Sequence, residues 1–200
     1  MSRTSSRLVL SWLLLLGLAA GGCATLSQVT ALSKVRFDLD RVTGSTLAGV
    51  RLEGKGSYRD LDATDLSRLA SAVASRHVPL EMTVHLNAQN PASNPVAARL
   101  LQLDWTLLVK DKETISGRLS QEFILPPGEP TDVPVAMQLD LWEFFARDGA
   151  EDLFTLAQSV AGAGAPTSIS LRATPTIQTS VGPIRYPGPI TIVHEQVGAR

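Results

Sequence analysis

The chain has 200 residues, of which 44% are hydrophobic and 18% are charged, and its formal net charge is −1. This length and composition suit one globular domain with a substantial core, or two small domains. Because the basic residues are scattered and the net charge is negative, we expect no nucleic-acid partner.

The first 22 residues have the layout of an export signal. Arg3 and Arg7 precede an apolar run of 13 residues from Leu8 to Ala20. A helix needs about 20 apolar residues to cross a bilayer, so the run is too short to span one and fits the core of a secretory signal peptide. No later stretch is long and apolar enough to cross a bilayer. We therefore interpret residues 1–22 as a signal peptide.

Small residues stand directly before the only cysteine, in the order Ala19-Ala20-Gly21-Gly22-Cys23. This segment resembles the lipobox of bacterial lipoproteins, where a peptidase cuts before the cysteine and the thiol carries a diacylglycerol. The family pattern favours Leu where this chain has Ala20. The alternative is an ordinary signal peptide with a chance or buried cysteine. Lipidation explains Cys23 better, because a lone cysteine in an exported chain has no disulfide partner.

The lipobox resemblance implies a mature chain that begins at Cys23 and is bound to a membrane through acyl chains, palmitate among them. One acyl chain gives only marginal anchoring, whereas two or three hold a domain firmly. Ala24, rather than Asp, follows the cysteine, and in lipoprotein sorting this favours the outer membrane of a diderm bacterium, with the domain facing the periplasm. Residues 23–33 would then be a tether.

The first part of the domain predicts two strands and a helix. Residues 34–41 and 47–54 alternate in polarity, with Thr43-Gly44-Ser45 as a turn between them. From Asp62 to Arg76 the period changes to that of a helix, with Asp62 as N-cap. The apolar stripe of this helix comprises Leu66, Leu69, Ala70 and Val73. We expect the helix to cover one open end of a sheet sandwich.

The clearest pattern runs from Val78 to Leu119 and predicts three strands. Apolar and polar residues alternate from Leu80 to Ala88, and Asn90-Pro91 then supplies strong turn chemistry. The remaining parts are a strand through 103–109, a turn at 111–113 and a strand from 114 to 119.

The last third predicts further strands and a second helix. A Pro-rich loop at 126–130 leads to a strand at 132–141 and an aromatic cluster from Trp142 to Phe145. Residues 148–161 follow as a helix with Asp148 as cap and Glu151 at the capping-box position. A strand at 168–173, with 176–179 as its potential extension, and a last strand at 189–195 end the chain. We predict a mainly β, antiparallel sandwich of about seven or eight strands with two added helices, as one domain over 34–196.

The central stretch resembles the WHy (water stress and hypersensitive response) domain of the late embryogenesis abundant type 2 family. The matching features are Asn90-Pro91, the apolar strand 100–109 and Ile115-Ser116-Gly117. Members often have Asn-Pro-Asn, whereas Ala92 follows Pro91 here. The resemblance implies an immunoglobulin- or fibronectin III-like sandwich and a non-enzymatic role in desiccation or stress tolerance. We interpret Asn90 and Pro91 as turn-forming residues.

Few residues suggest chemistry, and we predict no catalytic site, metal or cofactor. His77, His85 and His194 have no metal-ligand spacing, and there is no G-x-S-x-G motif or phosphate-binding glycine loop. Seven acids between Glu129 and Asp152 offer carboxylate oxygens to Ca²⁺, but they lack EF-hand spacing and also fit a solvated face.

The aromatic side chains Trp142, Phe144, Phe145 and Phe154 leave two alternatives. They would line a groove for an acyl chain, or they would bury the second helix on the sandwich. Our leading hypothesis is a lipid-anchored envelope protein with a protective or binding role under stress. The alternatives are a domain that binds or transfers lipids or other hydrophobic ligands, and a subunit that assembles with envelope proteins.

Overall fold

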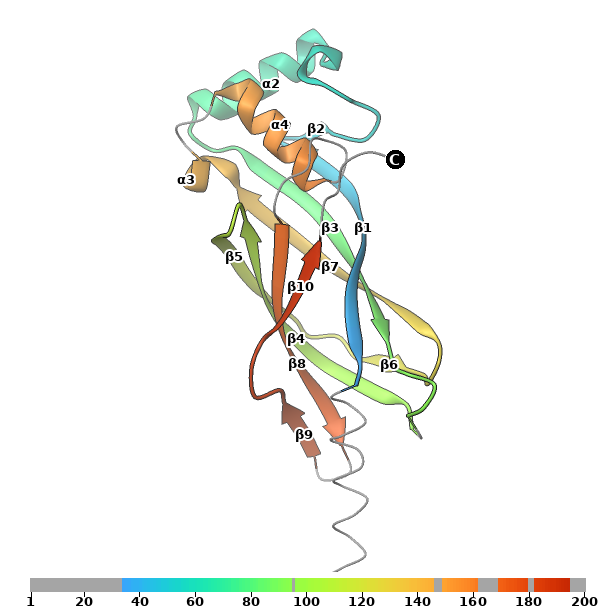
Figure 1. Cartoon of the computed structure of the whole chain (residues 1–200). Coiled ribbons are helices and arrows are strands. Elements are labelled where there is room, and N and C mark those ends of the chain that lie inside the picture. The colour runs from blue at the N-terminus through green and yellow to red at the C-terminus, as the bar shows by residue number, and fades with distance from the viewer. Residues whose placement is uncertain (1–33, 95, 146–148, 162–168, 180–181, 195–200) are drawn as a thin grey trace, which may run out of the picture.

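The computed structural model describes residues 34–94, 96–145, 149–161, 169–179 and 182–194. Two antiparallel sheets pack face to face, and the helices gather at one end of them (Figure 1). This confirms the predicted mainly β sandwich with added helices. The described residues contain ten strands rather than seven or eight, because three very short strands complete the sheet edges.

The first sheet has the order β2-β1-β3-β7. Its strands are β1 (Arg36–Leu47), β2 (Val50–Arg51), β3 (Pro79–Gln89) and β7 (Pro130–Asp140). Strands β3 and β7 pair along their whole length, from Pro79 opposite Asp140 to Gln89 opposite Pro130. The alternation seen in the sequence gives β3 one buried face and one polar face.

The second sheet has the order β10-β8-β4-β5. Its main strands are β4 (Ala98–Val109), β5 (Lys112–Leu119), β8 (Ile169–Thr179) and β10 (Ile190–His194). Two short strands lie off this path: β6 (Phe123–Leu125) pairs with β4, and β9 (Gly182–Arg185) pairs with β8. Trp105 of β4 points into the sandwich and is 8% exposed.

Two turns differ from the predictions. The chain does not turn at Gly44: β1 continues through it, with a bulge between Thr43 and Thr46 where Gly44 has φ +63°. The turn comes at Ala48-Gly49, which leads into β2. Likewise, the β4–β5 hairpin turns at Lys110-Asp111, where both residues have positive φ, one residue earlier than predicted.

The helices are the 3₁₀ turn η1 (Tyr58–Asp60), α2 (Ala63–Ala74), α3 (Leu141–Phe145) and α4 (Ala150–Val160). Asp62 caps α2 as predicted, because its carboxylate accepts a hydrogen bond from the Asp65 N–H at 2.8 Å. The short α3 was not predicted. At α4 the predicted cap, Asp148, lies outside the described residues, and the N-cap is Gly149.

The capping position of α4 is also one residue further along than predicted. Asp152, rather than Glu151, accepts a hydrogen bond from the Gly149 N–H, at 3.3 Å. Because Gly149 has no side chain, the reciprocal half of a capping box is missing here.

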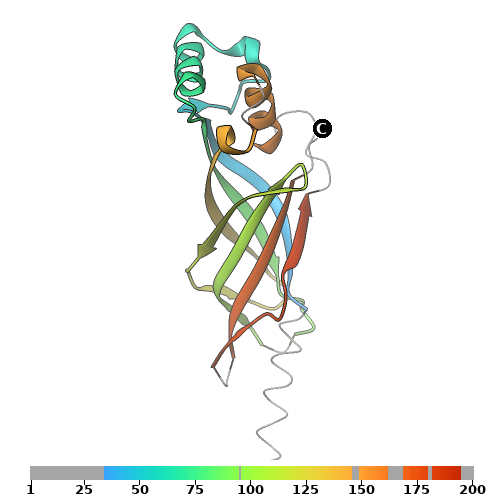
Figure 2. The ribbon, with the colours of Figure 1, turned by 90° about the vertical axis from the view of Figure 1, so that its left-hand side faces the viewer.

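One hydrophobic core joins both sheets and the helices. The predicted apolar stripe of α2 is only half buried: Leu69 is fully buried, whereas Leu66 and Ala70 are exposed. The helix packs against α4 and β2 at one end of the sandwich, and the side of the stripe that carries Leu66 and Ala70 faces solvent. Figure 2 shows the helices stacked on this end, which we call the helix end.

The opposite end is formed by the start of β1, the loop after β3 and the turn before β7 (Figure 1). Arg36, Asn90 and Gly128 mark these three segments. We call it the tether end, because β1 enters the sandwich there. The 12 residues of β1 separate the two ends by roughly 35–40 Å.

Candidate functional site

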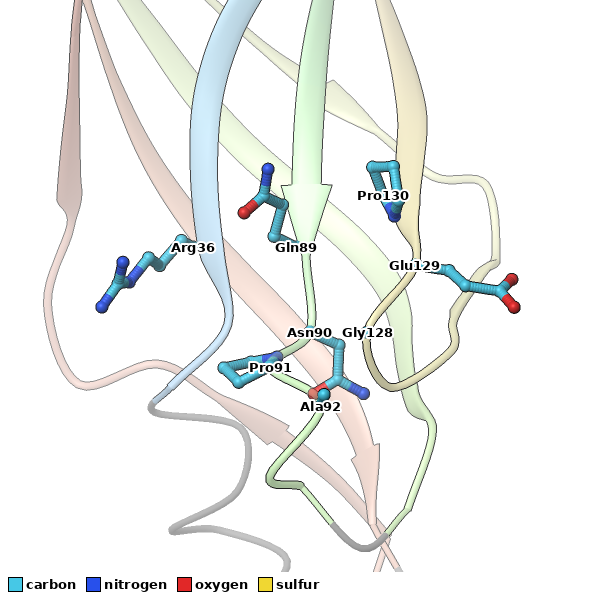
Figure 3. A pocket seen from close by; sticks show the side chains of 8 residues that line it. All are labelled: Arg36, Gln89, Asn90, Pro91, Ala92, Gly128, Glu129 and Pro130. Atoms are coloured by element: carbon cyan, nitrogen blue, oxygen red, sulfur yellow. The ribbon is translucent and has the colours of Figure 1, made fainter.

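The tether end contains an open cavity of about 420 Å³. It lies between the first residue of β1, the end of β3 and the turn into β7 (Figure 3). Arg36 and Glu129 point away from each other on opposite sides of the opening. The lining residues are Arg36, Gln89, Asn90, Pro91, Ala92, Gly128, Glu129 and Pro130.

Asn90 holds this end of the molecule together. Its side chain is 1% exposed, and its Nδ2 donates hydrogen bonds to the Val96 carbonyl at 3.1 Å and the Leu125 carbonyl at 2.8 Å. The Asn94 amide donates to its Oδ1, and the Gly128 N–H donates to its backbone carbonyl at 2.7 Å. Asn90 therefore joins three segments of the chain.

Pro91 lies beside Asn90 in the wall of the cavity, and its carbonyl accepts a hydrogen bond from the Asn94 N–H at 2.9 Å. This bond closes a four-residue turn from Pro91 to Asn94, directly after Asn90. Since the Asn90 amide bonds to internal partners, the groups that the cavity offers to a ligand are chiefly backbone atoms and the exposed side chains of Arg36, Gln89 and Glu129.

Cys23 and the tether, residues 23–33, lie outside the described residues. Arg36 follows Cys23 by 13 positions in the sequence. A fully extended chain of this length reaches at most about 45 Å.

The structure divides the four aromatic residues into two settings. Phe154 of α4 is 1% exposed, and its ring meets that of Tyr58 edge to face, with 5.8 Å between the centroids. Phe144 and Phe145 of α3 are only partly buried, and the Lys112 Nζ lies 5.6 Å from each ring centroid. Lys112 also donates to the Phe144 carbonyl at 2.9 Å.

Trp142, the fourth aromatic residue, is partly buried against the core. Its backbone N–H donates a hydrogen bond to Asp140 Oδ1 at 3.0 Å, which fixes the start of α3. Phe154, by contrast, packs fully inside the hydrophobic core, next to Tyr58 of η1.

The space between the sheets next to α4 is nearly filled. A void of about 10 Å³ lies there, and about 10–15 Å³ is needed to hold one water molecule. At this point the interior has no room for an acyl chain. Apolar side chains line the void: Leu39, Val42, Met82, Val84, Leu107, Val160, Ile169 and Leu171.

A hydroxyl, an imidazole and a carboxylate meet on the outer face of the first sheet. His85 Nε2 lies 3.0 Å from Thr43 Oγ1, and His85 Nδ1 lies 2.9 Å from both carboxylate oxygens of Asp132. With the proton on Nδ1, the ring donates to Asp132 and accepts from Thr43. Arg41 also contacts His85 Nδ1 and Asp132, at 3.2 and 3.3 Å.

This cluster was not predicted from the sequence, because His85 was considered only for metal-ligand spacing with the other histidines. Its members come from three strands, and only the registers of β1 and β7 on β3 bring them together. The alternating pattern already placed His85 on the polar face of its strand. The missing information was the strand order, which no local pattern contains.

Three components alone do not make a hydrolytic site. Acyl transfer also needs donors aimed at the developing oxyanion and a cavity that positions the substrate. None of Thr43, His85 and Asp132 lines either of the two cavities described above. The arrangement links β1, β3 and β7 across an exposed face.

Two further acidic residues form ion pairs with basic side chains. Asp104 lies 2.6 Å from both Arg118 and Arg185, and the hydrogen bond from Arg118 holds its pKa below the usual range against the effect of burial. Asp65 pairs with Lys55 at 2.8 Å, and this hydrogen bond likewise lowers the pKa of Asp65. Each acid therefore links its own segment to another one through an ion pair.

The other two histidines lie elsewhere in the fold. His77 Nδ1 lies 2.6 Å from Asp140 Oδ2, and His194 stands at the end of β10. Within the described part of the chain, no group of three His, Cys, Asp or Glu side chains is placed to hold a metal ion. No helix in that part is long and apolar enough to cross a membrane.

Comparison with known proteins gives no family for this chain. No family model and no curated protein matches it. A crystal structure of a protein from Archaeoglobus fulgidus is 13% identical with a TM-score of 0.36, over 82% of this chain and 92% of that one.

The solution structure of a putative late embryogenesis abundant protein is also 13% identical, with a TM-score of 0.38, over 90% of this chain and 84% of that one. Likeness at this level assigns neither a family nor a function, and membership of the WHy family stays a prediction.

Proposed function

We propose that this protein is a non-enzymatic lipoprotein of a bacterial envelope, anchored by acyl chains on Cys23 and protective or binding in function under desiccation or related stress. The observation that carries the proposal is the order of features before the sandwich: a positive start, a 13-residue apolar run that ends in Ala19-Ala20, then Gly21-Gly22 and one cysteine. The sandwich begins soon after, at Arg36, so Cys23 would hold it near the membrane surface.

The anchor is tested by the substitution Cys23→Ser. Cells that express the wild-type chain or the variant are fed an alkyne analogue of palmitate and are then fractionated. We expect label and membrane association in the wild type, and neither in the variant. An unlabelled wild-type chain, or a variant that stays in the membrane fraction, would refute the anchor. Ser5→Ala, in the leader and away from the cysteine, is the matched control.

The stress role rests on the resemblance of the central stretch to the WHy domain. It is tested by deleting the gene and measuring survival after drying, with the wild-type gene and the Cys23→Ser gene returned separately. We expect reduced survival that only the wild-type gene restores. Equal survival of the deletion strain and its parent would count against a protective role.

Neither of the two cavities that the described residues line is suited to a hydrophobic ligand. A ligand pocket needs several hundred Å³ with mainly apolar walls. The cavity of about 420 Å³ is lined by polar and backbone groups as well as prolines, and the apolar void between the sheets measures about 10 Å³. We therefore assign a hydrophobic ligand to neither of these two cavities, which are lined by described residues.

A further inference from the structure

Large hydrophobic side chains are exposed at three places in the described part of the chain. Ile124 is 56% exposed, Val96 is 42% exposed and Leu66 is 36% exposed. Single exposed apolar residues are common and need no explanation. Their distribution is informative here, because two of the three lie at one end of an elongated molecule.

Hydrogen bonds place Val96 and Ile124 together at the tether end. The amide of Asn90 donates to the Val96 carbonyl and to the carbonyl of Leu125, the residue after Ile124. Arg36, the first residue of β1, pairs with Gln89, the residue before Asn90. The most exposed apolar side chains therefore lie at the end where the chain arrives from Cys23.

Cationic side chains lie beside these apolar ones. Arg99 stands opposite Ile124 in the β4–β6 pairing, so the two side chains share a face. Its guanidinium is about half exposed and pairs with Glu122 at 2.6 Å. Arg36 is exposed on the wall of the nearby cavity, with Glu129 on the opposite side. Exposed apolar residues flanked by arginines are typical of surfaces that enter a bilayer interface.

We propose that the tether end is a membrane-docking surface, on which Val96 and Ile124 enter the headgroup region of the bilayer and Arg36 and Arg99 face lipid phosphates. The proposal deepens the proposed function and rests on the anchor at Cys23. It adds an orientation that the anchor alone does not dictate. A tether that reaches about 45 Å would let the sandwich face the membrane with any side.

The test uses single cysteines in the full-length chain. Acylation blocks Cys23, so Val96→Cys or Ile124→Cys supplies the only reactive thiol. Leu66→Cys is the matched control, since Leu66 is also an exposed apolar residue but lies at the helix end. Each purified protein is labelled with a polarity-sensitive dye and reconstituted into vesicles of phosphatidylethanolamine with a minority of phosphatidylglycerol. Circular dichroism checks that each variant is folded.

We expect the dye at positions 96 and 124 to shift to the blue and to be quenched by bromine-labelled lipids, while the dye at position 66 behaves as in water. Equal spectra at all three positions would overturn the proposal. A blue shift that appears in native envelope membranes but not in pure lipid vesicles would also overturn it, because the surface would then belong to a protein partner.

Failure of the anchor is detected separately in the same experiment. The wild-type chain takes up no dye if Cys23 is acylated, so labelling of the wild type refutes the anchor. Docking is then decided by flotation with the same vesicles. The double variant Val96→Asp/Ile124→Asp should bind about tenfold more weakly than Leu66→Asp. Equal flotation of the two variants would overturn the docking surface.

Discussion

Trp105 and Gly117 face each other across β4 and β5, and the indole lies where any larger side chain at position 117 would stand. A Cβ on Gly117 would be 2.3 Å from Trp105 Cζ2 and 2.7 Å from Cε2. The indole would have to shift inside the core. We expect Gly117→Ala to cost about 1–3 kcal/mol of unfolding free energy, measured by urea denaturation.

The matched control for this substitution is Gly188→Ala, because a Cβ at Gly188 meets nothing within 4 Å. It should change stability by less than about 0.5 kcal/mol. Adding Trp105→Phe to Gly117→Ala should restore part of the loss, since the smaller ring removes the contact. Equal stability of Gly117→Ala and the wild type would show that the indole is not held against the strand.

Asp140 gives a residue-scale prediction about pH. Burial acts to raise its pKa, but hydrogen bonds from the Val78 N–H, His77 and the Trp142 N–H outweigh burial and leave the pKa below its usual range. A carboxylate with a lowered pKa stabilises the fold above about pH 4, and this contribution is lost as the pH falls through the lowered value.

We therefore expect the wild type to lose stability on acidification more steeply than Asp140→Asn, which should be less stable at neutral pH. Thermal melts between neutral pH and the acid range would measure this difference. Asp38→Asn removes an exposed acid of β1 and should follow the wild-type profile. Parallel profiles of the wild type and Asp140→Asn would contradict the stabilising role of the Asp140 carboxylate.

Helix α2 offers a matched pair of leucines three residues apart. Leu69 is fully buried and Leu66 is 36% exposed. Truncation of a fully buried leucine removes its contacts and leaves a cavity, so Leu69→Ala should cost about 2–5 kcal/mol. Leu66→Ala should cost less than about 0.5 kcal/mol. Similar costs in urea denaturation would show that α2 packs with a different face.

The same helix shows how far periodicity predicts an element. Spacing and the Asp62 cap correctly gave the existence and the start of α2, because both are encoded locally. The buried face was only half right, since it depends on where α4 and β2 lie. The turn predicted at Gly44 was wrong for a related reason. A glycine with positive φ occurs in bulges as well as in turns, and only the pairing of β1 with β3 distinguishes the two.

The sites were less predictable than the elements. Asn90 was interpreted as a turn residue, and its bonds to the Val96 and Leu125 carbonyls depend on the approach of other segments. The contacts of His85 with Thr43 and Asp132 depend on the strand order in the same way. Local chemistry identifies which side chains can form such bonds, and the topology decides which partners they meet.

At the scale of the whole molecule, one core connects two ends with different character. Both sheets and α4 contribute to a single hydrophobic cluster. At the helix end, buried apolar side chains such as Phe154 pack together. At the tether end, hydrogen bonds from the buried amide of Asn90 join the segments. A domain of this kind should unfold in one cooperative step although its ends lie roughly 35–40 Å apart.

The double variant Leu69→Ala/Asn90→Ala tests this cooperativity. Asn90→Ala leaves two carbonyls without their donor and should cost about 1–3 kcal/mol. Because the two sites share no partners, their costs should add to within about 0.5 kcal/mol, with an unchanged urea m-value and coincident fluorescence and circular dichroism transitions. Gln89→Ala, on an exposed residue beside Asn90, is the control and should be nearly neutral. If the helix end unfolded independently, Leu69→Ala would instead split the transition in two, and the loss at Asn90 would appear only in the second step.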